Sequence, residues 1–158
     1  LGCFLREALN EIGGFDERFI RAQDWELNFR LRELGGKIYF DSRLEVTYRP
    51  RPNLLKLTKQ YFQYGTWRRV VSRSHSGTIN LRYLAPPFAL VGTLISLISG
   101  LLIHPILYLP AVVYGGFVLL SSLLIAKSVS EYFSLLAIIP TMHFAWGAGF
   151  ITSTKTLR

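Results

Sequence analysis

Residues 83–126 read YLAPPFALVGTLISLISGLLIHPILYLPAVVYGGFVLLSSLLIA, 44 consecutive residues without a lysine, arginine, aspartate or glutamate. A membrane-spanning helix needs about 20 apolar residues to cross a hydrocarbon core about 30 Å thick. The stretch is therefore long enough for two spans, and His104-Pro105 near its middle is a natural break because proline disrupts helices. A second uncharged run, 132–154, is long enough for a third span. We predict transmembrane helices over about 84–103, 106–126 and 132–153.

The charged residues are concentrated ahead of these runs. Residues 1–82 hold 15 of the 18 lysines and arginines and 9 of the 10 acidic residues. Beside a membrane segment this basic excess favours anionic lipid or phosphate ligands. Nucleic acid is excluded as a partner, because many acids share the segment and no nucleic-acid motif is present. The single cysteine, Cys3, excludes an internal disulfide and a Cys-built zinc site.

Arginines directly before the first span predict the orientation of the chain. Under the positive-inside rule they place the polar part on the cytoplasmic side of a multi-pass cell-membrane protein. Three crossings would then put Lys155 and Arg158 on the opposite side of the membrane. Their positive charge argues mildly against that position, and the alternatives are a re-entrant third span or a truncated tail. The arginines concerned are Arg68, Arg69, Arg73 and Arg82.

The polar part reads as alternating helices and short strands. Apolar spacing predicts a helix over 3–12 and a second helix that begins at Asp24 as N-cap and ends at Gly35-Gly36. Residues 37–40 and 44–48 have the composition of two short strands around a turn at 41–42. Asn53 is expected to cap a helix that runs to about Tyr64 and ends at Gly65.

Asp24 is the first candidate for chemistry. An ionised carboxylate at a loop–helix junction, stabilised by the helix N-terminus and by Arg18 and Arg21 in the preceding loop, can act as general base toward a hydroxyl. On local sequence alone an ordinary N-cap, worth about 1 kcal/mol, is the favoured explanation of this residue.

Several motifs in order resemble the second half of family 2 glycosyltransferases with the GT-A fold. They are Gly13-Gly-Phe-Asp-Glu17, Gln23-Asp-Trp-Glu-Leu27, Arg30-Leu31 and Gly35-Gly36, followed by the pair of short segments. The resemblance implies that Asp24 is the base that deprotonates the acceptor hydroxyl, and that Gln23, which stands where the family has Glu, contacts substrate. Transfer would proceed with inversion from a nucleotide-diphosphate sugar to a lipid-linked or envelope glycan acceptor, as in cell-envelope polysaccharide biosynthesis.

The family's donor-binding half and its Asp-x-Asp metal motif do not occur in these 158 residues. The resemblance implies a divalent cation, Mg or Mn, whose ligands would lie mostly in that N-terminal half. We therefore expect a bacterial-type C-terminal fragment that is inactive alone.

The segment Gln60-Tyr-Phe-Gln-Tyr-Gly-Thr-Trp-Arg-Arg69 is similar in placement to the Gln-x-x-Arg-Trp motif of processive family 2 enzymes. That similarity implies that Trp67 lines the acceptor site and that Arg68 approaches the pyrophosphate. The order here is Trp-Arg, and an interfacial helix with a Trp anchor explains the same residues. His75, in the basic linker, is interpreted as a surface residue.

The expected fold class is therefore α/β, an incomplete GT-A half followed by about three transmembrane helices. The expected divisions are a catalytic part over 1–65, a basic interfacial linker over 66–83 and a membrane region over 84–154. The alternative is a small basic membrane-anchored interaction module without catalytic activity. Expected partners are a nucleotide sugar, a glycan acceptor and membrane lipid.

Overall fold

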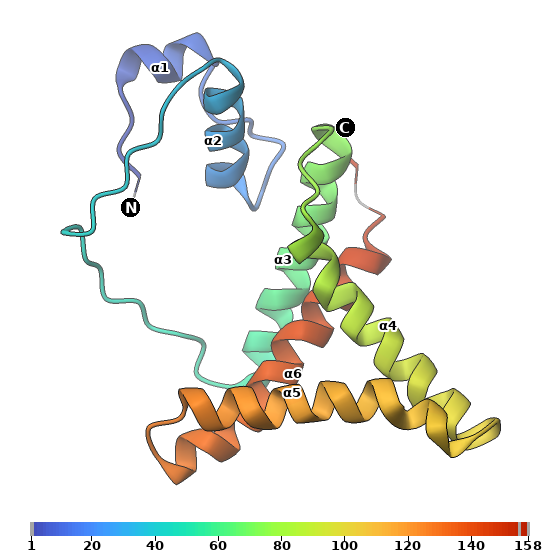
Figure 1. Cartoon of the computed structure of the whole chain (residues 1–158). Helices are drawn as coiled ribbons and strands as arrows, with labels where there is room; N and C mark the ends of the chain where they lie inside the picture. The colour runs from blue at the N-terminus through green and yellow to red at the C-terminus, as the bar shows by residue number, and fades with distance from the viewer. Residues whose placement is uncertain (1, 155, 158) are drawn as a thin grey trace.

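The computed structural model describes residues 2–154, 156 and 157, and all regular structure among them is helical (Figure 1). Two short helices in the polar part are followed by a long helix and by three apolar helices. The elements are α1 (Arg6–Glu11), α2 (Gln23–Glu33), α3 (Leu54–Ser74), α4 (Leu81–Leu102), the 3-10 turn η1 (Pro105–Tyr108), α5 (Leu109–Ile125) and α6 (Val129–Thr152).

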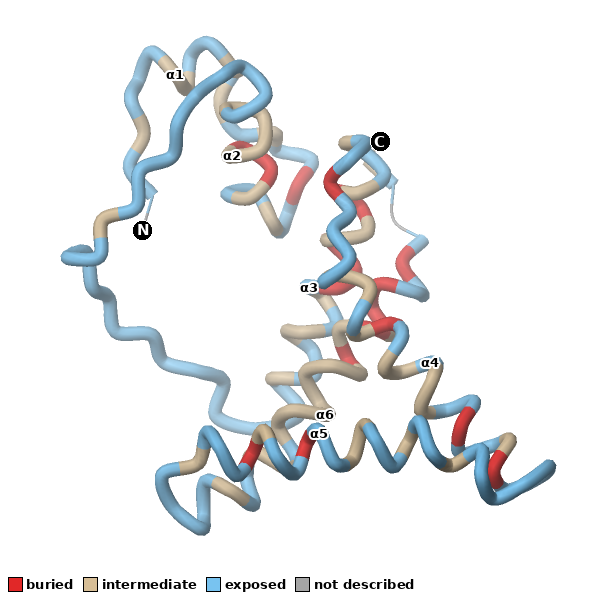
Figure 2. The backbone as a smooth tube through the Cα atoms, in the orientation of Figure 1, coloured by how far each residue is buried: buried red, intermediate tan, exposed pale blue. Residues whose placement is uncertain are grey.

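The predicted α/β fold class is wrong for the described chain. Residues 37–40 and 44–48 form no strand and lie in an extended, exposed segment that joins α2 to α3 (Figures 1 and 2). Their large apolar side chains are between 51% and 86% exposed. Strand composition does not suffice, because an isolated pair of strands is at best marginally stable without further strands or a covering helix. The turn at Asp41 does form, with the Leu44 amide donating to the Asp41 carbonyl at 3.2 Å.

Helix α3 begins where the sequence predicts but continues well past Gly65. The Asn53 side chain caps it by accepting from the Lys56 amide at 2.9 Å. Gly65 is buried against α6, and a Cβ there would overlap the Trp146 carbonyl. Gly149 of α6 lies as close to the Phe62 carbonyl of α3. These glycines therefore allow close approach of two backbones rather than ending a helix.

Helices α4 and α6, together with the η1–α5 segment, are each long and apolar enough to cross a membrane, which agrees with the three predicted spans. The break at His104-Pro105 is also confirmed, because His104 caps the short η1 turn through its ring Nδ1, which accepts from the Ile106 amide at 3.2 Å. Most large apolar side chains of α4 and α5 are exposed. Exposed apolar helix faces of this extent are those expected of a lipid-facing surface.

The start of α4 meets the end of α6. The Tyr83 and Trp146 rings stack with centroids 6.5 Å apart, and a Cβ on Gly147 would lie 2.6 Å from the Pro86 carbonyl. Arg73, at the end of α3, donates from Nη2 to the Ser153 carbonyl at 2.7 Å. Three successive full crossings would separate these two ends by the thickness of the membrane, so this contact disagrees with the predicted topology. Lys155 and Arg158 themselves lie outside the described residues.

The buried core of the polar part joins the segment before α2 to α3. Phe19, Trp67, Val70 and Val71 form one buried cluster, with Trp25 packed against it. Figure 2 shows buried residues at this junction and along the α3–α6 contact, whereas the segment between α2 and α3 is exposed. The loop before α2 and the first residues of α2 therefore dock onto the second half of α3.

Candidate functional site

The N-terminus of α2 carries the predicted base. Gln23 and Asp24 are the first two residues of the helix, and the N-cap is Ala22, so the expectation that Asp24 is the N-cap is wrong. Ala22 has left-handed backbone angles, φ 62° and ψ 21°, which are uncommon for a residue with a Cβ. The Asp24 carboxylate accepts from the Trp25 amide at 2.8 Å and is exposed. The carboxylate thus lies at the positive end of the helix dipole.

A cavity of about 810 Å³ lies in front of this helix end. Gln23, Asp24, Trp67 and Arg68, the residues singled out from the sequence, all line it. They come from the starts and middles of different helices, α2 and α3. The structure thereby brings all of the predicted site residues together, while their roles stay predictions.

Arg68 is held between two aromatic rings. Its guanidinium carbon lies 4.2 Å from the centre of the Trp25 ring and 4.3 Å from that of Tyr83. The Nη1 atom is buried without a hydrogen-bond partner among the described residues. Burial lowers the pKa of the Arg68 guanidinium, and the charges of Tyr83 and Asp24 oppose that effect while Arg82 adds to it. The result is a preoriented cation beside Asp24 with an unused donor.

Trp67 is mainly a core residue. Only 6% of it is exposed, and its ring lies 6.4 Å from that of Phe19 within the buried cluster. The alternative of an interfacial anchor exposed to lipid headgroups does not describe this position. Trp67 instead forms part of the inner wall of the cavity.

Sequence reasoning missed most of the remaining lining. From the sequence, Tyr64 falls in the helix that begins at Asn53, Arg82 and Tyr83 in the interfacial linker over 66–83, and Trp146 in the third predicted span. Periodicity gives no signal that the tertiary structure would bring these residues to the cavity that Asp24 lines. Arg21 lines the cavity as well, whereas Arg18 pairs with Asp16, with Nη2 and Oδ2 2.8 Å apart. That hydrogen bond lowers the pKa of Asp16. Of the two loop arginines, only Arg21 is therefore close to the candidate base.

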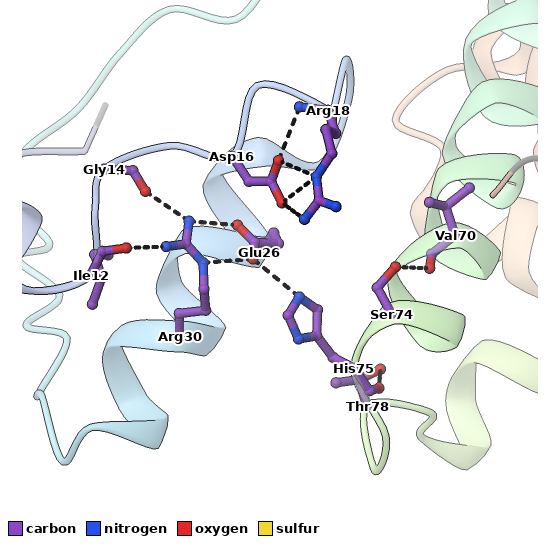
Figure 3. A network of polar contacts seen from close by, with 10 residues as sticks. All are labelled: Ile12, Gly14, Asp16, Arg18, Glu26, Arg30, Val70, Ser74, His75 and Thr78. Atoms are coloured by element: carbon purple, nitrogen blue, oxygen red, sulfur yellow. Dashed lines mark hydrogen bonds and ion pairs between the residues drawn. The ribbon is translucent and has the colours of Figure 1, made fainter. Parts of the chain in front are cut away.

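A polar network holds α2 in place (Figure 3). Glu26 is buried, 1% exposed, and receives two bonds from Arg30, from Nε at 2.6 Å and from Nη2 at 2.9 Å. Arg30 also donates to the carbonyls of Ile12 and Gly14. His75 Nε2 lies 3.0 Å from the same Glu26 carboxylate, and its ring stacks on Phe19. His75, interpreted from sequence as a surface residue, thus ties the linker before α4 to the helix that carries Asp24.

The divalent cation stays a prediction, because its ligands are expected mostly in the family's N-terminal half. Among the described residues no group of three or more His, Cys, Asp or Glu side chains could hold a metal ion. Asp24 is the only carboxylate among the described residues that line the cavity.

Similarity to curated proteins bears on the identity of this site. The succinoglycan biosynthesis protein ExoA of Rhizobium meliloti (strain 1021) is 32% identical over 149 residues, which cover 91% of this chain and 44% of ExoA. The dolichyl N-acetyl-alpha-D-glucosaminyl phosphate 3-beta-D-2,3-diacetamido-2,3-dideoxy-beta-D-glucuronosyltransferase of Methanococcus voltae is 35% identical over 89 residues, 56% of this chain and 27% of that enzyme. No protein-family model matches the chain, and no solved structure matches it significantly.

The resemblance to part of a family 2 glycosyltransferase is confirmed. The chain spans less than half the length of the curated relatives it matches. The similarity to ExoA covers nearly the whole chain, including the apolar helices.

Proposed function

We propose that this chain contributes the catalytic base and the membrane-side wall of an inverting glycosyltransferase at the cytoplasmic face of the cell membrane. The donor is a nucleotide-diphosphate sugar, and the acceptor is a lipid-linked or envelope glycan. The observation that carries the proposal is that Asp24 and Arg68 line one cavity together with Tyr83 at the start of α4.

Asp24 takes the proton from the acceptor hydroxyl. Its carboxylate is exposed to the cavity at the start of α2 and is not engaged in an ion pair among the described residues. As the hydroxyl oxygen attacks the anomeric carbon, the bond from that carbon to the nucleotide diphosphate breaks. Attack on the face opposite the leaving group inverts the configuration. General-base assistance of this kind contributes roughly 10²–10⁴-fold to a rate.

Arg68 stabilises the departing diphosphate. The two rings that sandwich its guanidinium fix its orientation, and its buried Nη1 has no protein partner in the described chain. A preorganised cation of this kind acts where charge develops in the transition state. The proposal assigns acceptor contacts to Gln23 and, through its small exposed part, to Trp67, since both residues line the same cavity as Asp24.

The test uses the complete protein in membrane vesicles with radiolabelled UDP-glucose, UDP-galactose and UDP-N-acetylglucosamine as donors. Asp24→Asn should lower sugar incorporation by roughly 10²-fold or more. The matched control is Asp41→Asn, because Asp41 is a carboxylate of the same chain that lines none of the cavities described here. Full sugar incorporation by the Asp24 variant would show that Asp24 is not the base. If the unsubstituted protein incorporates no more sugar than vesicles without it, the proposed glycosyltransferase activity is wrong.

Arg68→Lys separates the enzyme from the basic membrane module. The substitution keeps the charge but loses the planar group that stacks on both rings. If Arg68 acts in catalysis, the Arg68→Lys variant should have lower turnover and unchanged membrane association. If Arg68 is only part of a membrane anchor, neither property of the variant should change.

A further inference from the structure

A second cavity, of about 510 Å³, is also lined by Trp25 and Tyr83. Its walls come from one face of α2 (Trp25, Phe29 and Arg32), from the linker over 77–80 and from the first residues of α4. Asp24, Trp67 and Arg68 do not line it. It is therefore a separate recess that shares only Trp25, Arg82 and Tyr83 with the candidate active site.

The charge of this cavity is one-sided. Arg32 and Arg82 line it, and none of its described lining residues is acidic. Neither arginine forms an ion pair within the described residues, in contrast to Arg18, Arg30 and Arg43, each of which pairs with a carboxylate. Arg32 donates weakly to the Asn28 carbonyl at 3.4 Å, and Arg82 donates to the Tyr83 hydroxyl at 3.0 Å. Two uncompensated guanidinium groups that converge on one recess favour an anion with several oxygens.

The rim of the cavity is apolar and lies at the start of the first candidate membrane span. Leu81, 79% exposed, is the first residue of the first candidate span, and Ile79, 45% exposed, precedes it. The inner wall is aromatic, with the Trp25 and Phe29 rings stacked at 5.7 Å. A free inorganic anion needs no such apolar rim. An amphipathic anion fits the two arginines, the apolar rim and the apolar surface of α4 together, because its headgroup can contact the arginines while its acyl chains lie along α4.

We propose that this cavity binds the phosphate headgroup of an anionic phospholipid of the surrounding bilayer. Arg32 and Arg82 contact the phosphate, and Ile79 and Leu81 contact the first methylenes of the acyl chains. Because Trp25 and Tyr83 also sandwich Arg68, a bound lipid stiffens one wall of the candidate active site. The inference rests on the cavity and the apolar helices alone, so it stands or falls independently of the glycosyltransferase proposal.

The test measures lipid retention by native mass spectrometry on the complete protein, solubilised in mild detergent with phosphatidylglycerol or phosphatidylcholine and without any sugar donor. A basic residue near an anionic lipid surface contributes about 1 kcal/mol, or about fivefold in affinity. Arg32→Gln and Arg82→Gln should each weaken phosphatidylglycerol retention about fivefold, and the double variant about 25-fold. Phosphatidylcholine retention should not change.

Arg49→Gln is the matched control, because Arg49 is an exposed arginine of the polar part that lines neither arginine-bearing cavity. An equal loss with Arg49→Gln, or equal retention of the two lipids by the parent protein, would overturn the proposal. A competition arm adds inorganic phosphate and inorganic pyrophosphate. If either displaces phosphatidylglycerol at concentrations comparable to the lipid, the cavity is a soluble-phosphate site and the lipid assignment is wrong.

Discussion

Helix α3 makes two contacts that differ in kind. On one side it lies against α6 so closely that Gly65 and Gly149 are needed for the backbones to pass. Thr66 and Ser153 add side-chain bonds across that contact, with Ser153 Oγ donating to the Thr66 carbonyl at 3.2 Å. On the other side α3 holds the segment before α2 and the start of α2 through one small apolar cluster, and the Glu26–His75 pair follows directly after α3.

The difference separates a rigid platform from a docked catalytic element. Backbone-to-backbone packing is specific to shape and tolerates little change. A few side chains around one buried carboxylate form a weaker attachment, whose loss would release α2 while leaving the membrane helices assembled. The position of Asp24 therefore depends on the contact between α2 and α3. The position of Trp146 on the cavity wall depends on the contact between α3 and α6.

The largest expected effect concerns the side of the membrane on which the chain ends. With Cys3 replaced by serine, single cysteines in place of Ser76 and Thr156 should react with an impermeant maleimide from the same face, because Arg73 is bonded to Ser153. A cysteine in place of His104, at the far end of α4, should react from the opposite face. Labelling of the first two positions from opposite faces would refute the α3–α6 contact.

The next effect is on the platform. Gly149→Ala places a methyl group on the Phe62 carbonyl, so one backbone must move, at or above the upper end of the roughly 1–3 kcal/mol that overpacking costs. Gly116→Ala, in an equally apolar helix with no atom within 4 Å of the added Cβ, should have no such cost. The thermal midpoint of the detergent-solubilised protein measures both, and equal midpoints would contradict the close packing.

A smaller, local effect is expected at the docked element. Glu26→Ala removes the carboxylate that pairs with both Arg30 and His75. Breaking a fully buried pair costs about 3–5 kcal/mol. We expect about 2 kcal/mol here, because the Arg30 and His75 side chains remain 24% and 22% exposed to solvent.

Amide hydrogen exchange distinguishes this release from global unfolding. In the Glu26 variant exchange should rise in α2 and remain slow in α6. Glu33→Ala, an exposed carboxylate at the end of the same helix, is the control. Faster exchange in α6 as well would show that the two contacts are one cooperative unit.

The smallest effect lies in the exposed segment between α2 and α3. The hydrogen bond from Arg43 lowers the pKa of Asp41, so any stabilisation is present above its ordinary value of 3.8 and is lost as the pH falls through the lower folded value. Because the Arg43 side chain is 85% exposed, water screens the pair, and Asp41→Asn should leave the thermal midpoint unchanged between neutral and mildly acidic pH. A clear shift in this comparison would show that the segment is packed more firmly than its exposure indicates.

The local chemistry of the chain explains which predictions succeeded. The uncharged runs determined three apolar helices, because backbone groups in a bilayer must be satisfied within a helix. Asn53 and His104 determined where helical segments begin, since capping involves only neighbouring residues. The strands over 37–48 were predicted wrongly, because strand composition specifies a sheet only when a partner is present.

The sequence by itself determined the polar and apolar halves and the residues worth testing, Gln23, Asp24, Trp67 and Arg68. Only the tertiary structure decided that these residues share one cavity, that Trp67 is buried and that Arg68 is stacked between Trp25 and Tyr83. It also decided that α6 returns to the end of α3 and that His75 holds α2. The physical reason is that charge runs and caps act between neighbours in the chain, whereas cavities, stacked rings and close glycine contacts depend on which distant surfaces meet.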